Sequence, residues 1–193
     1  MYVLARFTLK SFVLILITTF AQSLQAEYRN PIVKILLFSS SAGVFLSNTD
    51  GLNLSQNGRN LGTVKSIRVA PGDPSHLLIN NKQSAKGSLM IIAQGKTSIQ
   101  DTRHRNQRRY LGAFEIRPFA GGLRLINHIP MELYLEVERN AEISTKWHME
   151  VVKAQAVISR TFALFKRERR RQHPWHVSAD HFDQVYKGSD IAD

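Results

Sequence analysis

The chain has 193 residues, 43% of them hydrophobic, which suits one globular domain or a small domain with an extension. It holds 26 Lys and Arg against 15 Asp and Glu, and the net charge of +11 predicts attraction to nucleic acid, anionic lipid or anionic wall polymers. There is no cysteine, which excludes disulfides, thiolate zinc sites, a cysteine nucleophile and a lipid anchor on cysteine.

The N-terminus has the three-part pattern of a secretory signal. Arg6 and Lys10 precede an apolar stretch over 12–20. The segment Leu24-Gln25-Ala26 then predicts cleavage after Ala26. The apolar stretch is short for a membrane span, and the alternative is an uncleaved anchor. We therefore expect an exported protein, in the periplasm, the cell wall or outside the cell, that meets the membrane only during export. Export argues against a nucleic-acid partner in spite of the charge.

The region 27–109 predicts a β-rich N-terminal part. Apolar, β-branched or alternating runs predict strands at 31–38, 43–46, 52–54, 64–69 and 89–93. Residues 48–51, with the sequence NTDG, predict a turn between two of these strands, and residues 71–74 predict a loop. Residues 100–109, QDTRHRNQRR, show no periodicity and predict a solvated connection, with a binding patch as the alternative.

The region 110–193 changes from strands to helices. Residues 110–117 and 123–127 predict a hairpin joined at Gly121-Gly122, and 131–139 predicts a short helix with Pro130 at its start. The fold class that follows is α+β, with β structure first and helices after it.

A second, longer helix is expected to begin at Ser144 or Thr145, either of which could cap it. Helical spacing predicts a buried stripe of Trp147, Val151, Ala154, Val157, Thr161 and Leu164. The small residues Ala154, Ala156 and Ser159 would let a neighbouring element approach closely. The basic run 166–171 lies where cations complement the helix dipole, so it needs no ligand.

Few residues suit catalysis. The seven histidines show no tight metal-ligand spacing, no serine lies in a nucleophile-elbow pattern, and we expect neither a metal nor a cofactor. Glu142 lies between the two predicted helices, where a helix N-terminus would lower the pKa of its carboxyl. A general acid needs the opposite, and apolar neighbours such as Leu135, Ile143 and Trp147 could provide it by burial.

Several motifs lie in the C-terminal half of the chain. They are Asn127-x-x-Pro130-x-Glu132-x-Tyr134-Leu135, Glu142-Ile143, Trp147, Glu150, the string KAQAVISRTFA over 153–163, and Asp183-Gln184-Val185-Tyr186-x-Gly188. With these motifs, the stretch from Tyr110 to Gly188 resembles the stage II sporulation protein D and amidase-enhancer family, the SpoIID/LytB domain.

The resemblance implies a peptidoglycan-binding fold and, in the sporulation branch, a lytic transglycosylase acting on glycan strands stripped of stem peptides. It places the catalytic acid/base on Glu142 and substrate binding on Lys153 and Arg160. A single carboxyl suits this reaction, whereas ordinary glycosidases use two. Lys153 and Arg160 are seven residues apart, two helical turns, and would share one helix face.

The chain departs from the family pattern at three points. Ile143 stands where the family has Met, Val137 stands where Gly is usual, and the family has a long segment after the element that ends at Gly188. We therefore expect a truncated SpoIID-like core over 110–193. The alternative to an enzyme is a non-catalytic wall-binding module or amidase enhancer, or an inactive truncated relative. The expected partners are peptidoglycan glycan strands and, for the alternative, a cell-wall amidase.

Overall fold

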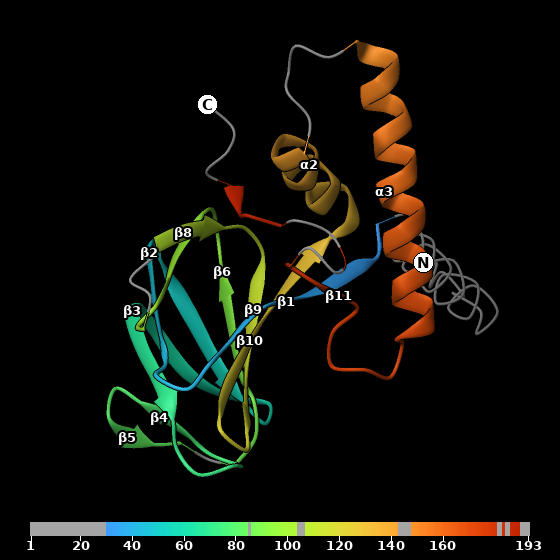
Figure 1. Ribbon diagram of the computed structural model, residues 1–193. Helices are drawn as coiled ribbons and strands as arrows, with labels where there is room; N and C mark the ends of the chain where they lie inside the picture. The colour runs from blue at the N-terminus through green and yellow to red at the C-terminus, as the bar shows by residue number, and fades with distance from the viewer. Residues whose placement is uncertain are drawn as a thin grey trace, which may run out of the picture. The chain divides into compact units, whose positions relative to one another are not determined.

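Extended runs with alternating burial dominate the chain after Asn30. The computed structural model describes residues 30–84, 86–103, 107–142, 148–180, 183 and 186–189, without the side chains of 138–142, so the predicted signal peptide lies outside the described residues. The elements, drawn in Figure 1, are β1 (Ile32–Ser40), β2 (Val44–Gln56), β3 (Arg59–Pro71), β4 (Leu77–Ile79), β5 (Lys82–Gln83), β6 (Leu89–Ala93), β7 (Thr97–Asp101), β8 (Gln107–Tyr110), β9 (Ala113–Phe119), β10 (Gly122–Pro130), α2 (Met131–Glu142), α3 (Met149–Arg169) and β11 (Val177–Ser178).

The strands form one sheet in the order β11-β1-β10-β9-β6-β2-β3-β4-β5, and β7 and β8 extend it from β2. Most pairs are antiparallel, as in the β9–β10 hairpin where Ile116 pairs with Leu125. β11 pairs with β1 in parallel, since the chain returns to the sheet only after both helices. β9 pairs with β6, so strands from before and after residue 109 share the sheet. The fold is thus β-rich with two described helices, in keeping with the α+β class.

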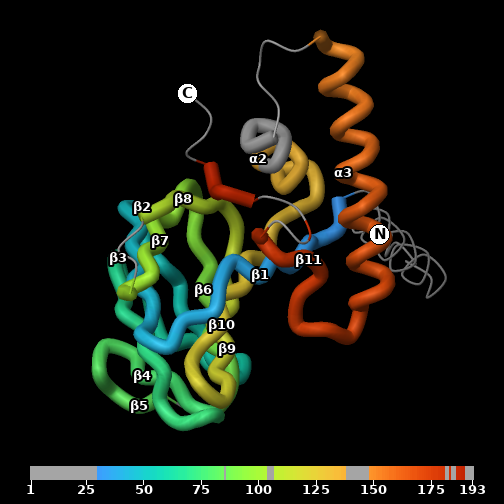
Figure 2. Tube along the Cα trace, viewed as in Figure 1, coloured from blue at the N-terminus to red at the C-terminus, as the bar shows by residue number. Residues whose placement is uncertain are grey.

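The long strand β2 lets the sheet fork. β3 pairs along both halves of β2, while on the other edge β7 pairs with residues 44–47 and β6 with residues 52–56. Figure 2 shows β6 and β7 beside β2. The register shifts between Ser47 and Leu52, where the strand bends without ending. A turn over 48–51 that separates two strands is therefore a wrong prediction.

The buried side of the sheet is the core. In β1, β2 and β6 most of the buried residues alternate with more exposed ones, whereas in β9 and β10 neighbouring residues are buried as well. The fully buried strand residues include Val33, Ile35, Val44, Leu46, Leu52, Ile91, Phe114, Ile116, Leu123 and Leu125. Burial of each such side chain contributes about 1.5–3 kcal/mol. α2 adds Met131, Tyr134 and Leu135 to this core.

Most predicted strands are confirmed. β1, β3, β6 and the β9–β10 hairpin lie where alternation or β-branched runs predicted them, and α2 covers the predicted short helix. The solvated connection over 100–109 is wrong at both its ends, which belong to the paired strands β7 and β8. β8 begins with three exposed polar residues, 107–109, so the apolar alternation that predicts a strand is missing there.

The start of α3 differs from its prediction. α3 begins at Met149 with His148 as N-cap, whose Nδ1 accepts a hydrogen bond from the Glu150 N–H at 3.3 Å. Ser144 and Thr145 are therefore not its cap. Trp147, the first member of the predicted stripe, lies outside the described residues.

The buried stripe predicted along α3 is also wrong. Val151, Val157 and Leu164 are exposed, with Val157 at 62%, whereas Ser159 and Ala163 are fully buried. Apolar residues lie on both sides of this helix, so their spacing does not select the buried side. The buried side carries the small residues Ser159 and Ala163, which allow close packing, whereas the small residue Ala154 is exposed.

One buried amide joins the C-terminal segment to the sheet. The side chain of Asn127 is fully buried and donates to the carbonyls of Leu111, at 2.9 Å, and Ala113, at 3.0 Å. Its Oδ1 accepts a hydrogen bond from the Tyr186 hydroxyl at 3.0 Å. Burial, and to a lesser degree Tyr110, raises the pKa of the Tyr186 phenol, so it remains a donor. Three polar groups, two carbonyls and one hydroxyl, therefore depend on this one side chain.

We predict that Asn127→Ala lowers the free energy of unfolding by about 2–4 kcal/mol, because it leaves buried polar groups without partners. Asn60→Ala is the control, since Asn60 is exposed and accepts a single bond from Gly62 N–H; it should cost about 0.5 kcal/mol. Urea unfolding followed by circular dichroism measures both. Equal losses in the two variants would contradict the role given to Asn127.

Candidate functional site

Glu142, the predicted acid/base, is the last residue of α2. The sequence placed it between the two helices, ahead of the second, and the structure includes it in the first, because α2 runs longer than predicted. Its side chain is outside the described residues, so the backbone alone places it.

Lys153 and Arg160, the predicted substrate-binding pair, are both exposed on α3 and lie two turns apart. Each has an acidic neighbour. Lys153 Nζ lies 2.8 Å from Glu150 Oε1 on the same helix, and Arg160 Nη2 lies 2.5 Å from Glu132 Oε2 on α2. Surface pairs of this kind stabilise a fold little, and they can exchange a carboxylate of the protein for one of a ligand.

The basic C-terminal end of α3 is more than a solvated end. Asp183, 4% exposed at its side chain, accepts from Lys166 Nζ at 2.5 Å, Arg170 Nη1 at 3.1 Å and the Ser178 N–H at 2.8 Å. Burial raises the pKa of Asp183, but the bonds from Lys166 and Ser178 and the charges of Arg170 and Lys166 together outweigh it, and the net pKa is lowered. Part of the basic run is therefore bound to a buried carboxylate, which charge counting in the sequence missed.

His176 was also missed by the sequence analysis. It precedes β11 and is 5% exposed. The ring nitrogen Nδ1 of His176 accepts from the Lys34 backbone N–H at 3.1 Å, and the backbone N–H of His176 donates to the Lys34 carbonyl at 2.8 Å. Burial, and then the positive charge of Lys34, lowers its pKa from 6.5 to about 4. The ring is thus neutral and structural.

A second buried carboxyl lies on the sheet. Glu115 Oε2 is 3.0 Å from His128 Nε2, and Oε1 is 3.4 Å from Arg117 Nε. Burial raises the pKa of Glu115, but hydrogen bonds from His128 and Ser88 and the charge of Arg117 lower it further than burial raises it. Glu115 is thereby held ionised, which is unsuited to a general acid.

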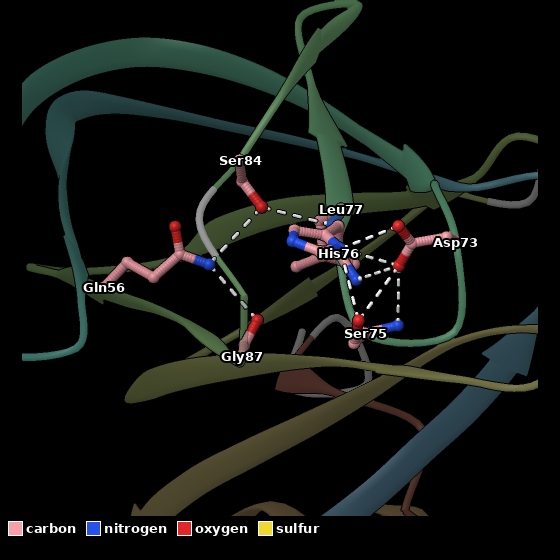
Figure 3. A network of polar contacts seen from close by, with 7 residues as sticks. All are labelled: Gln56, Asp73, Ser75, His76, Leu77, Ser84 and Gly87. Atoms are coloured by element: carbon pink, nitrogen blue, oxygen red, sulfur yellow. Dashed lines mark hydrogen bonds and ion pairs between the residues drawn. The ribbon is translucent and has the colours of Figure 1, made fainter.

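Asp73, Ser75 and His76 are close together, as Figure 3 shows, but they do not form a catalytic triad. Both the carboxylate of Asp73, at 2.7 Å, and the hydroxyl of Ser75, at 3.2 Å, approach the same ring nitrogen, Nδ1 of His76. A triad needs its acid and its nucleophile on different ring nitrogens. Asp73 Oδ1 also accepts from the Ser75 and His76 N–H groups, so the cluster stabilises the loop between β3 and β4.

The described part of the chain offers no group of three histidine or acidic side chains placed to hold a metal ion. None of its helices is long and apolar enough to cross a membrane.

Comparison with known proteins finds a family that matches part of the chain. The family model SpoIID, described as stage II sporulation protein, matches residues 120–193. That range holds Glu142, Lys153 and Arg160, together with Asn127 and Tyr186 of the buried network. The match confirms the resemblance to the SpoIID family for this part of the chain. No curated protein and no solved structure matches the chain.

We predict that stability falls as the pH drops from 6.5 towards about 4, because unfolding exposes His176 and lets it take up a proton. The sign follows from the lowered pKa: above 6.5 both states are neutral, and below it only the unfolded state is protonated until about pH 4. The loss reaches about 3 kcal/mol.

Urea unfolding at a series of pH values measures this loss. His176→Asn keeps an acceptor for the Lys34 N–H and removes the titration, so its stability should vary less between pH 6.5 and about 4.5. Glu115 and Asp183 have lowered pKa values and contribute only below that range. An unchanged slope in His176→Asn would rule out this assignment.

Proposed function

Since residues 120–193 match the SpoIID family, we propose that this chain is an exported, peptidoglycan-acting protein that cleaves glycan strands as a lytic transglycosylase. The observation that carries the proposal is this match over a range that includes Glu142, Lys153 and Arg160. The position of Lys153 and Arg160 on the exposed side of α3 supports it, since both can reach a long polymer.

The proposed reaction uses one carboxyl twice. As an acid, Glu142 protonates the glycosidic oxygen, and the bond from that oxygen to C1 of the muramic residue breaks. As a carboxylate, Glu142 then accepts the proton of the muramic C6 hydroxyl while the oxygen of that hydroxyl forms the new bond to C1. The product is an anhydro ring, Glu142 ends in its starting protonation state, and no water is consumed.

Lys153 and Arg160 would bind carboxylates or hydroxyls of the strand. Arg160 is paired with Glu132, whose side chain is 52% exposed, so on binding a carboxylate of the strand would replace that of Glu132 as the partner of Arg160. The exchange costs little because an exposed ion pair is worth about 0–1 kcal/mol.

A non-catalytic wall-binding module is the second candidate, and one observation favours it. Where the pKa of a described carboxyl is shifted, namely at Asp73, Glu115 and Asp183, the shift is downward. A general acid needs an upward shift. The enzyme proposal thus depends on Glu142 alone.

We predict that the purified chain releases anhydro-muramyl ends from stem-free glycan strands, as measured by mass spectrometry. Glu142→Gln should lower the rate by about 100-fold or more, because an acid/base group typically contributes that much. Glu136→Gln, an exposed acid on the same helix, is the matched control and should act like the parent. If the parent chain yields no anhydro ends but still binds the strands, the wall-binding module is the better description.

Arg160 and Glu132 can be tested as a pair. If Arg160 binds the strand, Arg160→Gln should weaken strand binding about fivefold, while Glu132→Gln should leave it unchanged or stronger. Both variants lose the same ion pair and should lose the same small amount of stability. Equal weakening of binding by both variants would show that Arg160 acts by holding α2 against α3.

A further inference from the structure

A row of serines crosses the outer face of the sheet at the fork in β2. Ser66 on β3 pairs with Ser47 on β2, and Ser47 pairs with Ser98 on β7. Ser98 pairs in turn with Arg109 on β8. Directly paired residues point to the same side of a sheet, so these four side chains form one line, here called the serine row.

A second line of side chains lies next to the serine row. Arg68 pairs with Phe45, Phe45 with Gln100, and Gln100 with Gln107, each two positions from a member of the serine row. Phe45 is 37% exposed, although its strand neighbours Val44 and Leu46 are fully buried. The two lines together are here called the outer sheet face.

A hollow of about 560 Å³ opens over the serine row. Three of its lining residues are the short-chained serines of the row, Ser47, Ser66 and Ser98. Its lining includes three cations, Lys65, Lys96 and Arg109, and one acid, Asp50. None of its lining residues belongs to α2 or α3, so it shares no residue with the site proposed around Glu142.

The walls of this hollow are held by Asn48, which is 5% exposed. Its Oδ1 accepts from the N–H groups of Asp50, at 2.7 Å, and Gly51, at 3.1 Å. Its Nδ2 donates to the carbonyls of Gln94, at 2.8 Å, and Lys96, at 3.2 Å. One buried amide therefore fixes the backbone under both Asp50 and Lys96.

The C-terminal segment supports the opposite wall. Ser189 Oγ donates to the Arg109 carbonyl at 3.1 Å, and Lys96 Nζ donates to the Ser189 carbonyl at 3.4 Å. Gly188, at φ +88°, lies so close that a Cβ would come within 2.4 Å of the Arg109 carbonyl oxygen. The hollow is thus preorganised on both sides, as a binding site requires.

The groups around the hollow suit a sugar polymer with carboxylates. Lysine and arginine can bind carboxylates, while serine hydroxyls and the Asp50 carboxylate can bond sugar hydroxyls. Phe45 offers an apolar surface to a sugar ring. Single-stranded nucleic acid fits less well, because it is bound by several stacking aromatics and would be repelled by Asp50.

We propose that the outer sheet face is a glycan-binding surface for a strand that carries carboxylates. The identity of that glycan rests on the proposed function: a peptidoglycan strand stripped of its stem peptides exposes lactyl carboxylates. The surface holds the strand through Lys65, Lys96 and Arg109, and it does no chemistry.

The test is strand binding by the full chain carrying Glu142→Gln, so that the probe is not cut. Lys65→Gln with Lys96→Gln should weaken binding to stem-free glycan strands about tenfold, since two charges are lost at the surface. Arg59→Gln with Lys82→Gln, two exposed cations on β3 and β5, is the matched control and should change binding less than about twofold. Thermal unfolding confirms that both pairs fold.

A chemical control uses the same strands with their carboxylates converted to methylamides. The methylamide strands should bind weakly to the Glu142→Gln chain. Their affinity should be about that of native strands for the Lys65, Lys96 variant. Equal weakening by both pairs of substitutions would assign binding to net charge and overturn the proposal, as would tight binding of the methylamide strands. A single-stranded DNA probe that binds more tightly than the glycan, and loses affinity in the Lys65, Lys96 variant, would also overturn it in favour of nucleic acid.

These outcomes are separate from those of the proposed reaction. If no anhydro ends are released and the Lys65, Lys96 variant binds strands tenfold more weakly, the catalytic proposal is wrong and the proposed glycan-binding surface is supported. If anhydro ends are released and that variant binds strands as tightly as its parent, the catalytic proposal is supported and the proposed surface is wrong.

Discussion

The buried side chain of Asn127 is the contact on which the C-terminal half depends. It bonds the carbonyls of Leu111 and Ala113 and accepts from the hydroxyl of Tyr186, which lies 59 residues after Asn127, so it ties the start of β9 to the C-terminal segment. The Tyr186 ring packs 5.7 Å from Tyr134 and 5.8 Å from Tyr110, measured between ring centroids. Asn127, Tyr134 and Tyr186 belong to the motifs that carry the family resemblance, and here they are structural. A motif match is therefore evidence for the fold before it is evidence for the chemistry.

The parts of the fold that the sequence predicted are those whose information is local. β6 and the β9–β10 hairpin follow from apolar runs, and the turn of the hairpin is Ala120-Gly121, one residue before the predicted Gly121-Gly122. The continuity of β2 was missed because Asn48 replaces local ladder bonds with bonds to a loop about 46 residues away. The β7–β8 pair was missed because few of its side chains are buried. In α3, apolar residues on both sides left the choice of the buried side to tertiary packing.

The candidate site shows the same division between local and long-range information. Glu142, Lys153 and Arg160 came from the resemblance, and periodicity alone would have left α3 as a packed helix. The ion pairs of Asp183 could not be predicted, because Lys166 and Arg170 read as part of a solvated basic run. His176 reads as one histidine among several, and its neutral state comes from burial against Lys34.

The distribution of positive charge connects the two proposals. The cations at the end of α3 are held partly by Asp183, so they contribute less to attracting a polyanion than the count of +11 suggests. At the outer sheet face the lining has three cations and one acid, and Asn48 fixes its backbone. A glycan strand held there would bring its other sugar units near the protein at high effective concentration. Binding energy from sugars that do not react can then serve to orient the one that does, which is how a single carboxyl on α2 could act on a long, flexible polymer.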